Sequence, residues 1–165
     1  MILGMTTSTY TLVHVVISLI SIGSGVVVLW GMIRNKRLDG ITIIFLASTV
    51  LTSVTGFGFP FDHLGPAHKV GMISLVLLVL AILARYPLYL AGPWRWTYVI
   101  TACAALYLNV LVFVTQLFEK SPVLKALAPT RSEPPFLVTQ VVALGVFVGL
   151  TIVAVRNFQV ESGLG

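Results

Sequence analysis

Long apolar runs alternate with short polar segments along the whole chain. A helix needs roughly 20 apolar residues to cross a hydrocarbon core of about 30 Å. Five runs meet or approach this length, and no Asp, Glu, Lys or Arg interrupts the centre of any of them. Each run is expected to be α-helical, because backbone polar groups in lipid must be satisfied within the segment. The predicted spans are residues 9–33, 41–59, 70–86, 94–118 and 136–155.

A shorter amphipathic segment separates the fourth and fifth spans. Ser121 can cap a helix there, Pro122 suits a first helical turn, and the apolar residues that follow are three or four positions apart. This pattern predicts a helix lying on the membrane surface. We therefore predict an all-α integral membrane helical bundle with five transmembrane helices and a short interfacial helix near 121–128. Residues 1–165 are expected to form a single transmembrane domain.

The composition agrees with a membrane location. Of the 165 residues, 58% are hydrophobic and 9% are charged, whereas an ordinary soluble domain carries about 25% charged residues. This excludes a water-soluble enzyme. The formal net charge is +5, but the basic residues fall singly or in threes between apolar runs. That distribution is typical of cytoplasmic loops, so the expected partner is a lipid bilayer and no nucleic acid is expected.

The basic residues also predict an orientation. No Lys or Arg precedes the first span, while Arg34, Lys36 and Arg37 follow it. The first span is therefore expected to be retained, with the N-terminus outside and the C-terminus in the cytoplasm. An aromatic belt is expected at the cytoplasmic interface. Its predicted members are Trp30, Tyr86, Tyr89, Trp94, Trp96 and Tyr98.

Uncharged polar residues recur inside the predicted spans and allow two interpretations. They can form hydrogen bonds between packed helices, which membrane bundles commonly use. Alternatively, they can line a cavity between the first, second and fourth spans, where a mid-depth amide such as Asn109 must find a partner. The candidate cavity or ligand residues are Asn109, Thr52, Ser48, Gln116 and Ser18. Small residues at a spacing of four, Ser21 with Gly25 and Gly145 with Gly149, favour close helix packing.

The three histidines are expected to gather at one end of the bundle. His14 lies near the start of the first span, and His63 and His68 lie in the loop after the second span, close to Asp62. Successive spans alternate direction, so this loop and the start of the first span lie on the same side of the membrane. Imidazole and carboxylate groups bind zinc or iron, and two histidines can hold haem. A metal or haem site is therefore one hypothesis for these four residues.

Two parts of the chain resemble a known group of proteins. One runs from Leu38-Asp39-Gly40 to Thr55-Gly56-Phe57 and the loop after it, and the other joins Ala126-Leu127-Ala128-Pro129 to Ser132-Glu133-Pro134-Pro135-Phe136. These stretches resemble small multi-pass inner-membrane proteins of bacteria that have no assigned activity. The resemblance implies a bacterial inner membrane and adds no mechanism.

Three functional hypotheses follow from these patterns. The chain contains no nucleophile–base pair with a supporting acid, no glycine-rich phosphate loop and no intramembrane carboxylate. We therefore favour a non-enzymatic membrane protein that acts by helix association, as a homo-oligomer or as an accessory subunit of a membrane-protein partner. The first alternative is a channel, a transporter or a lipophilic-ligand-binding protein. The second is a metal- or haem-binding membrane redox protein that uses the histidines.

Overall fold

The computed structural model describes residues 4–59 and 65–159, and this part of the chain folds into six α-helices. Five of them are long and apolar enough to cross a membrane. By helix length and hydropathy the chain is a multi-pass membrane protein, which confirms the predicted all-α fold with five spans and a short helix. The helices are α1 (Thr7–Ile33), α2 (Asp39–Gly56), α3 (Pro66–Arg85), α4 (Trp94–Lys120), α5 (Pro122–Leu127) and α6 (Pro134–Asn157).

The helix boundaries follow local capping chemistry. Helix α1 begins after Thr6, whose hydroxyl accepts a hydrogen bond from the Thr9 amide at 3.2 Å. Helices α3 and α6 each begin at a proline, where the missing amide hydrogen costs nothing. Helix α3 therefore starts four residues earlier than the sequence pattern predicts. Its 20 residues exceed the 18 of α2, which is the shortest of the five long helices in the described chain.

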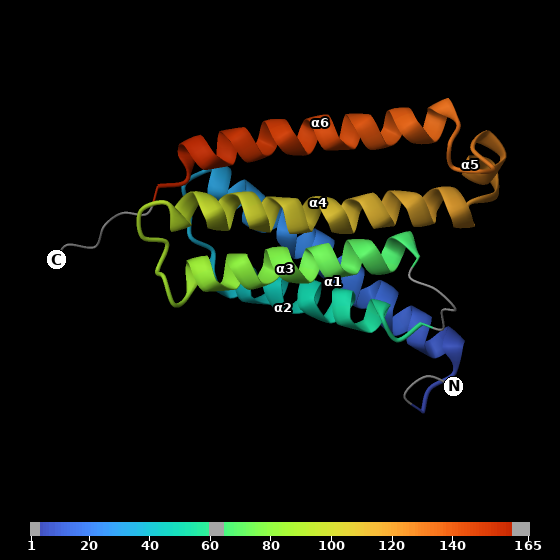
Figure 1. Ribbon diagram of the computed structural model, residues 1–165, viewed down its shortest axis with the longest axis horizontal. Coiled ribbons are helices and arrows are strands. Elements are labelled where there is room, and N and C mark those ends of the chain that lie inside the picture. Colours follow the sequence, from blue (N-terminus) through green and yellow to red (C-terminus); the bar gives the residue numbers. More distant parts are fainter. Residues whose placement is uncertain (1–3, 60–64, 160–165) are drawn as a thin grey trace.

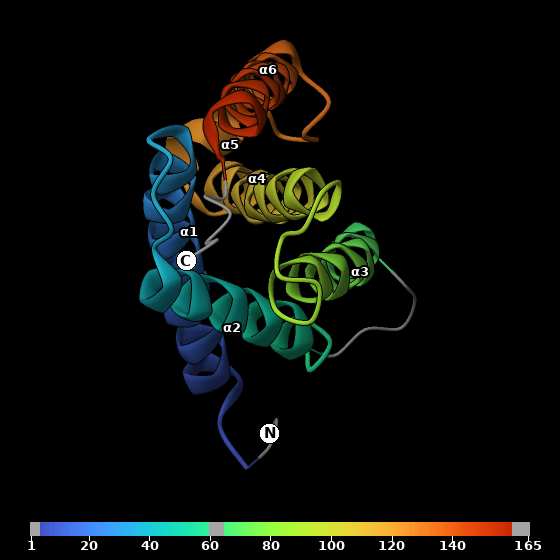
Figure 2. The same cartoon turned by 90° about the vertical axis from the view of Figure 1, so that its left-hand side faces the viewer.

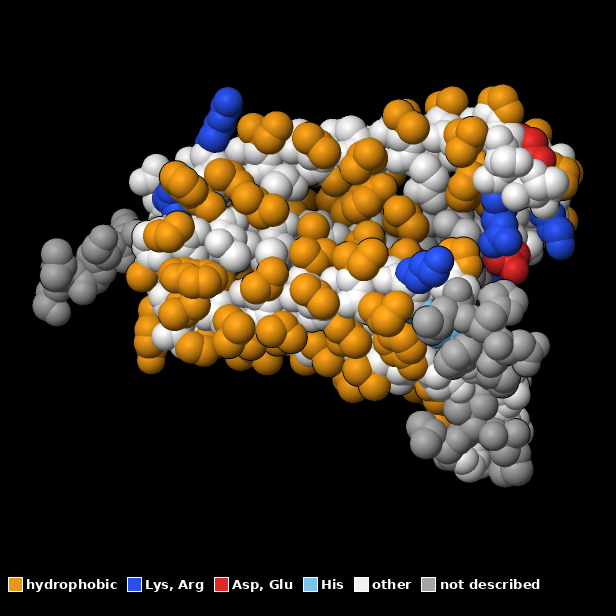
Figure 3. Space-filling view, in the orientation of Figure 1, with side chains coloured by type: hydrophobic (Ala, Val, Ile, Leu, Met, Phe, Trp, Pro, Cys, Tyr) orange, Lys and Arg blue, Asp and Glu red, His pale blue; other side chains and the backbone are white. Residues whose placement is uncertain are grey.

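The long helices run back and forth between two ends of the molecule (Figure 1). We call the end at which α1 begins and α2 ends the histidine end, because His14 and His68 lie near it. The opposite end, which carries Arg34, Arg37 and Arg85, is the arginine end. Every described Asp, Glu, Lys and Arg lies in a loop, in α5 or within four residues of the end of a long helix. Figure 3 shows the result: hydrophobic side chains cover the middle of the visible face, and charged side chains lie toward its ends.

Helices α1 to α4 form a four-helix unit, and α6 lies outside it. Helix α1 packs on α2, α3 packs on α4, and α4 also contacts α1 and α6 (Figure 2). The buried hydrophobic cluster joins all five long helices and includes Met32, Phe45, Leu78, Leu106 and Ala154. The extensive contacts of helix α6 are with α4 and α1 alone. Ala154 is the one buried residue of this helix.

The loop before α6 is ordered by one carboxylate. Glu133 accepts hydrogen bonds from the Thr130 amide at 3.1 Å, the Thr130 hydroxyl at 2.8 Å and the Ser132 amide at 3.1 Å. Desolvation acts to raise the pKa of this carboxyl, but the bonds donated by Thr130 and the neighbouring backbone amides lower it overall. The loop is therefore held by an ionised Glu133.

Candidate functional site: polar side chains inside the bundle

Three polar residues from three helices meet in the interior. The Asn109 amide in α4 donates to the Ser21 hydroxyl in α1 at 2.7 Å. That hydroxyl lies 2.6 Å from the Thr49 hydroxyl in α2, which also donates to the Phe45 carbonyl at 2.6 Å. Ser21 and Thr49 are completely buried. We call Ser21, Thr49 and Asn109 the three-helix cluster; its hydrogen bonds connect α1, α2 and α4.

A close helix crossing lies one turn from this cluster. A Cβ atom placed on Gly25 of α1 would lie 2.5 Å from Leu106 Cδ1 and 2.8 Å from Phe45 Cε2. Both distances are shorter than real carbon contacts, so only glycine fits here without movement of its neighbours. Ser21 and Gly25 thus act together on α1. Ser21 forms the hydrogen bonds, and Gly25 allows α2 and α4 to approach α1 closely enough for those bonds.

The other predicted cavity residues lie outside the three-helix cluster. Ser18 donates to the His14 carbonyl, and Ser48 donates to the Ile44 carbonyl, so both bond within their own helices. Thr52 and Gln116 form no side-chain hydrogen bond to any described residue, and the Thr52 hydroxyl oxygen is buried. Of the five candidates, only Asn109 is part of an interhelical hydrogen-bond cluster.

The surface of the described residues has apolar grooves between neighbouring helices. One lies between α2 and α3 and has a volume of about 560 Å³; another lies between α4 and α6 and has a volume of about 250 Å³. None of Asn109, Thr52, Ser48, Gln116 or Ser18 lines either groove.

Among the described residues, the histidine end contains two imidazoles in different surroundings. His14 Nδ1 lies 2.8 Å from the Thr55 hydroxyl, and the His14 ring meets the Phe59 ring edge-on. The His68 ring lies 5.8 Å from the Phe57 ring, measured between centroids. The other two predicted ligands, Asp62 and His63, lie outside the described residues. Within 4–59 and 65–159, no group of three or more His, Cys, Asp or Glu side chains is placed to hold a metal ion.

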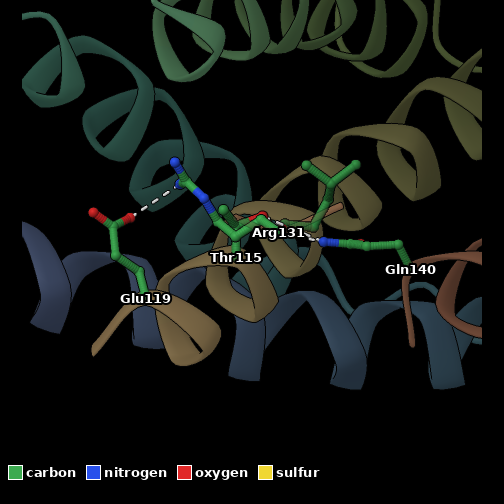
Figure 4. Close-up of polar contacts among 5 residues, drawn as sticks. Thr115, Glu119, Arg131 and Gln140 are labelled. Carbon is green, nitrogen blue, oxygen red and sulfur yellow. Dashed lines mark hydrogen bonds and ion pairs between the residues drawn. The ribbon is translucent and has the colours of Figure 1, made fainter. Parts of the chain in front are cut away.

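Further polar contacts join neighbouring helices. Ser53 of α2 donates to Ser74 of α3 at 3.2 Å. Gln140 of α6 donates to the Leu111 carbonyl of α4 at 3.2 Å and to Thr115 at 3.3 Å (Figure 4). Gln140 lies within the predicted span 136–155, but nothing in the sequence identifies its partners.

Of the three ion pairs among the described residues, two join segments that are distant in the sequence. Glu119 at the end of α4 pairs with Arg131 in the loop before α6 at 3.2 Å, as Figure 4 also shows. At the arginine end, Arg85 of α3 pairs with Asp39 of α2, and its guanidinium lies 5.0 Å from the centroid of the Tyr98 ring.

The Arg85–Asp39 pair was missed in the sequence analysis. The Arg85 side chain is 2% exposed, whereas the Asp39 side chain is 66% exposed. The alternating direction of the spans brings the start of α2 and the end of α3 to the same side of the bundle. This alternation is the feature of the sequence that could have revealed the pair. Tyr98 is fully buried beneath Arg85, so the prediction that it belongs to the interfacial aromatic belt is wrong.

No family model, curated protein or solved structure matches this chain. The resemblance to bacterial inner-membrane proteins is therefore supported only at the level of a multi-pass helical membrane protein.

Proposed function

We propose that this multi-pass membrane protein acts by association, and that the outer face of α6 binds a helix of a second copy or of another membrane protein. The observation that carries the proposal is the exposure of α6. Only Ala154 is buried among its 24 residues, although the other long helices each bury several. Association with a further helix would cover this face.

The outer face of α6 has the shape that close packing requires. Val142, Gly145 and Gly149 are spaced at i, i+3 and i+7 and lie on one helical face. A Cβ atom on either glycine would meet no atom within 4 Å. Small residues allow helix backbones to approach each other in lipid, where van der Waals packing drives association. Gly25 shows the same use of glycine inside this chain, where α2 and α4 fill the space beside it.

Photo-crosslinking in native membranes tests this proposal. A benzophenone amino acid at Val142 is compared with one at Val76 of α3, because the two side chains are similarly exposed, at 58% and 62%. We expect position 142 to give a discrete protein adduct and position 76 to give none. An adduct of twice the 17.8 kDa chain mass indicates a second copy, and any other mass indicates a different protein. Only diffuse lipid adducts at both positions would contradict the proposal.

A glycine substitution supplies the matched control. Gly145→Leu together with Gly149→Leu should abolish the discrete adduct from position 142, because the added side chains hold the partner helix away. Gly23→Leu on α1 should leave it unchanged, since a Cβ on Gly23 also meets no atom within 4 Å. Equal loss in both variants would argue against a specific role for α6.

The resemblance and the basic residues support a bacterial inner membrane with the N-terminus outside and the C-terminus in the cytoplasm. Fusions of two reporters to each terminus test this orientation. Alkaline phosphatase is active only outside the cytoplasm, and green fluorescent protein fluoresces in the cytoplasm. Both termini on the same side would contradict it.

A further inference from the structure

The groove between α2 and α3 has the dimensions of a binding site for one lipid chain. It is lined by apolar side chains, including Ile43, Ala47, Leu51 and Ile82, and by Tyr86, which supplies the only side-chain hydroxyl. From Ile43 to Leu51 the helix rises about 12 Å. One leaflet of the hydrocarbon core is about 15 Å deep. The groove thus follows most of one leaflet.

The groove ends beside charged residues at the arginine end. Ile43 lies one helical turn from Asp39, and Tyr86 follows Arg85 directly. Asp39 pairs with the buried Arg85 and lies 3.9 Å from Arg37 Nε. Arg37 has a side chain that is 45% exposed and makes no other ion pair or hydrogen bond to the described residues. Arg37, Asp39 and Arg85 together carry a net charge of +1.

We propose that this groove binds one acyl chain of an anionic phospholipid, whose single phosphodiester lies against Arg37. The net charge of +1 complements the −1 of a phosphatidylglycerol headgroup, whereas a zwitterionic phosphatidylcholine offers no net charge to match. Basic groups at the membrane surface attract anionic lipids in this way. The apolar lining explains the binding of the acyl chain, and Arg37 explains the preference for an anionic headgroup.

The small side chain of Ala47 keeps the groove open. Ala47 is exposed and lies one turn from both Ile43 and Leu51 on α2. A tryptophan at this position would occupy the space proposed for the acyl chain. The groove lies between α2 and α3, and Figure 2 shows both helices away from α6. This inference therefore goes beyond the proposed association and does not depend on it.

Native mass spectrometry of the full chain in neutral detergent tests the proposal, with phosphatidylglycerol and phosphatidylcholine titrated separately. We expect one phosphatidylglycerol to bind about fivefold more tightly than phosphatidylcholine, the effect of about one basic group at the surface. Arg37→Gln should remove this preference. Arg34→Gln should keep it, because the Arg34 guanidinium lies over the Trp30 ring. Equal binding of both lipids, or equal effects of the two substitutions, would overturn the proposal.

The acyl-chain part is tested by Ala47→Trp against Val76→Trp, which adds the same side chain at an exposed position of α3 outside the groove. Ala47→Trp should abolish the bound lipid, and Val76→Trp should retain it. Folding is checked by the protection of the buried Cys103 from a thiol reagent. If Ala47→Trp does not fold, the Arg37→Gln comparison decides. Displacement of the lipid by millimolar inorganic phosphate would show a phosphate site in place of a lipid site.

Discussion

Replacing Gly25 with alanine should destabilise the bundle, although alanine is the better helix former. Gly25 lies where α1 crosses α2 and α4. The new methyl group would lie 2.5 Å from Leu106 Cδ1 and within 2.9 Å of two Phe45 ring carbons. Leu106 and Phe45 are each 1% exposed, so neither has open space into which to move. The methyl group therefore has to push the helices apart.

The size of the effect follows from two opposing terms. Overpacking of a filled core costs about 1–3 kcal/mol. Alanine in place of glycine in a helix contributes about 0.5–1 kcal/mol of stability. We expect Gly25→Ala to lower the free energy of unfolding by about 1 kcal/mol net. Gly23→Ala is the matched control, because its methyl group meets no atom within 4 Å. The difference between the two variants isolates the packing cost.

The single cysteine provides the assay. Cys103 is buried, so its reaction with a fluorescent thiol reagent reports unfolding during a titration from mild detergent into sodium dodecyl sulfate. Gly25→Ala should unfold at a lower dodecyl sulfate fraction than the unmodified protein, and Gly23→Ala should not. If the two variants unfold together, Leu106 and Phe45 do not fix the position of α1, and the reasoning about the crossing is wrong.

Three further predictions test polar contacts. Asn109→Leu should lower the free energy of unfolding by about 0.6 kcal/mol in the same assay, the average for one interhelical hydrogen bond; a loss above about 2 kcal/mol would contradict this. A double-mutant cycle of Arg85→Gln and Asp39→Asn should give a coupling energy of about 1 kcal/mol that falls with added salt, and zero coupling would contradict the pair. The lowered pKa of Glu133 means that its contribution to loop order is present above its ordinary value of 4.5 and is lost as pH falls through the lower folded value. The Thr130 amide resonance should therefore titrate with a midpoint below 4.5, and Glu133→Gln should remove that titration.

The five spans could be predicted because lipid permits few alternatives. A chain segment in the hydrocarbon core must satisfy its own backbone, and this requires long uninterrupted apolar helices. The ends of the helices were harder to predict. Polar residues such as His68 and Lys69 suggested a loop, whereas α3 begins at Pro66 and contains both of them. Tyr98 was misplaced for a related reason. Its burial depends on Arg85 of α3 and on Phe158, which directly follows α6, and no pattern within α4 shows that.

The two small-residue patterns show a second limit of the sequence. Ser21 with Gly25 and Gly145 with Gly149 have the same spacing, and both predict close helix packing. The structure gives Gly25 two neighbours within the chain and gives the α6 glycines none among the described residues. What distinguishes them is the shape of Phe45 and Leu106 on other helices. Asn109 was more informative, because an amide in lipid needs a partner wherever its helix packs.

The two proposals concern different surfaces of the bundle and different sources of selectivity, so each can be tested without the other. The outer face of α6 has open backbone at Gly145 and Gly149 and no described charge near its centre, so its selectivity would come from shape. The groove between α2 and α3 ends at Arg37, so its selectivity would come from charge. Arg37→Gln should therefore leave α6 crosslinking unchanged, and the double glycine variant should keep its lipid preference. Loss of both the α6 crosslinking and the lipid preference in either variant would indicate general damage to the fold. The two experiments would then support neither proposal.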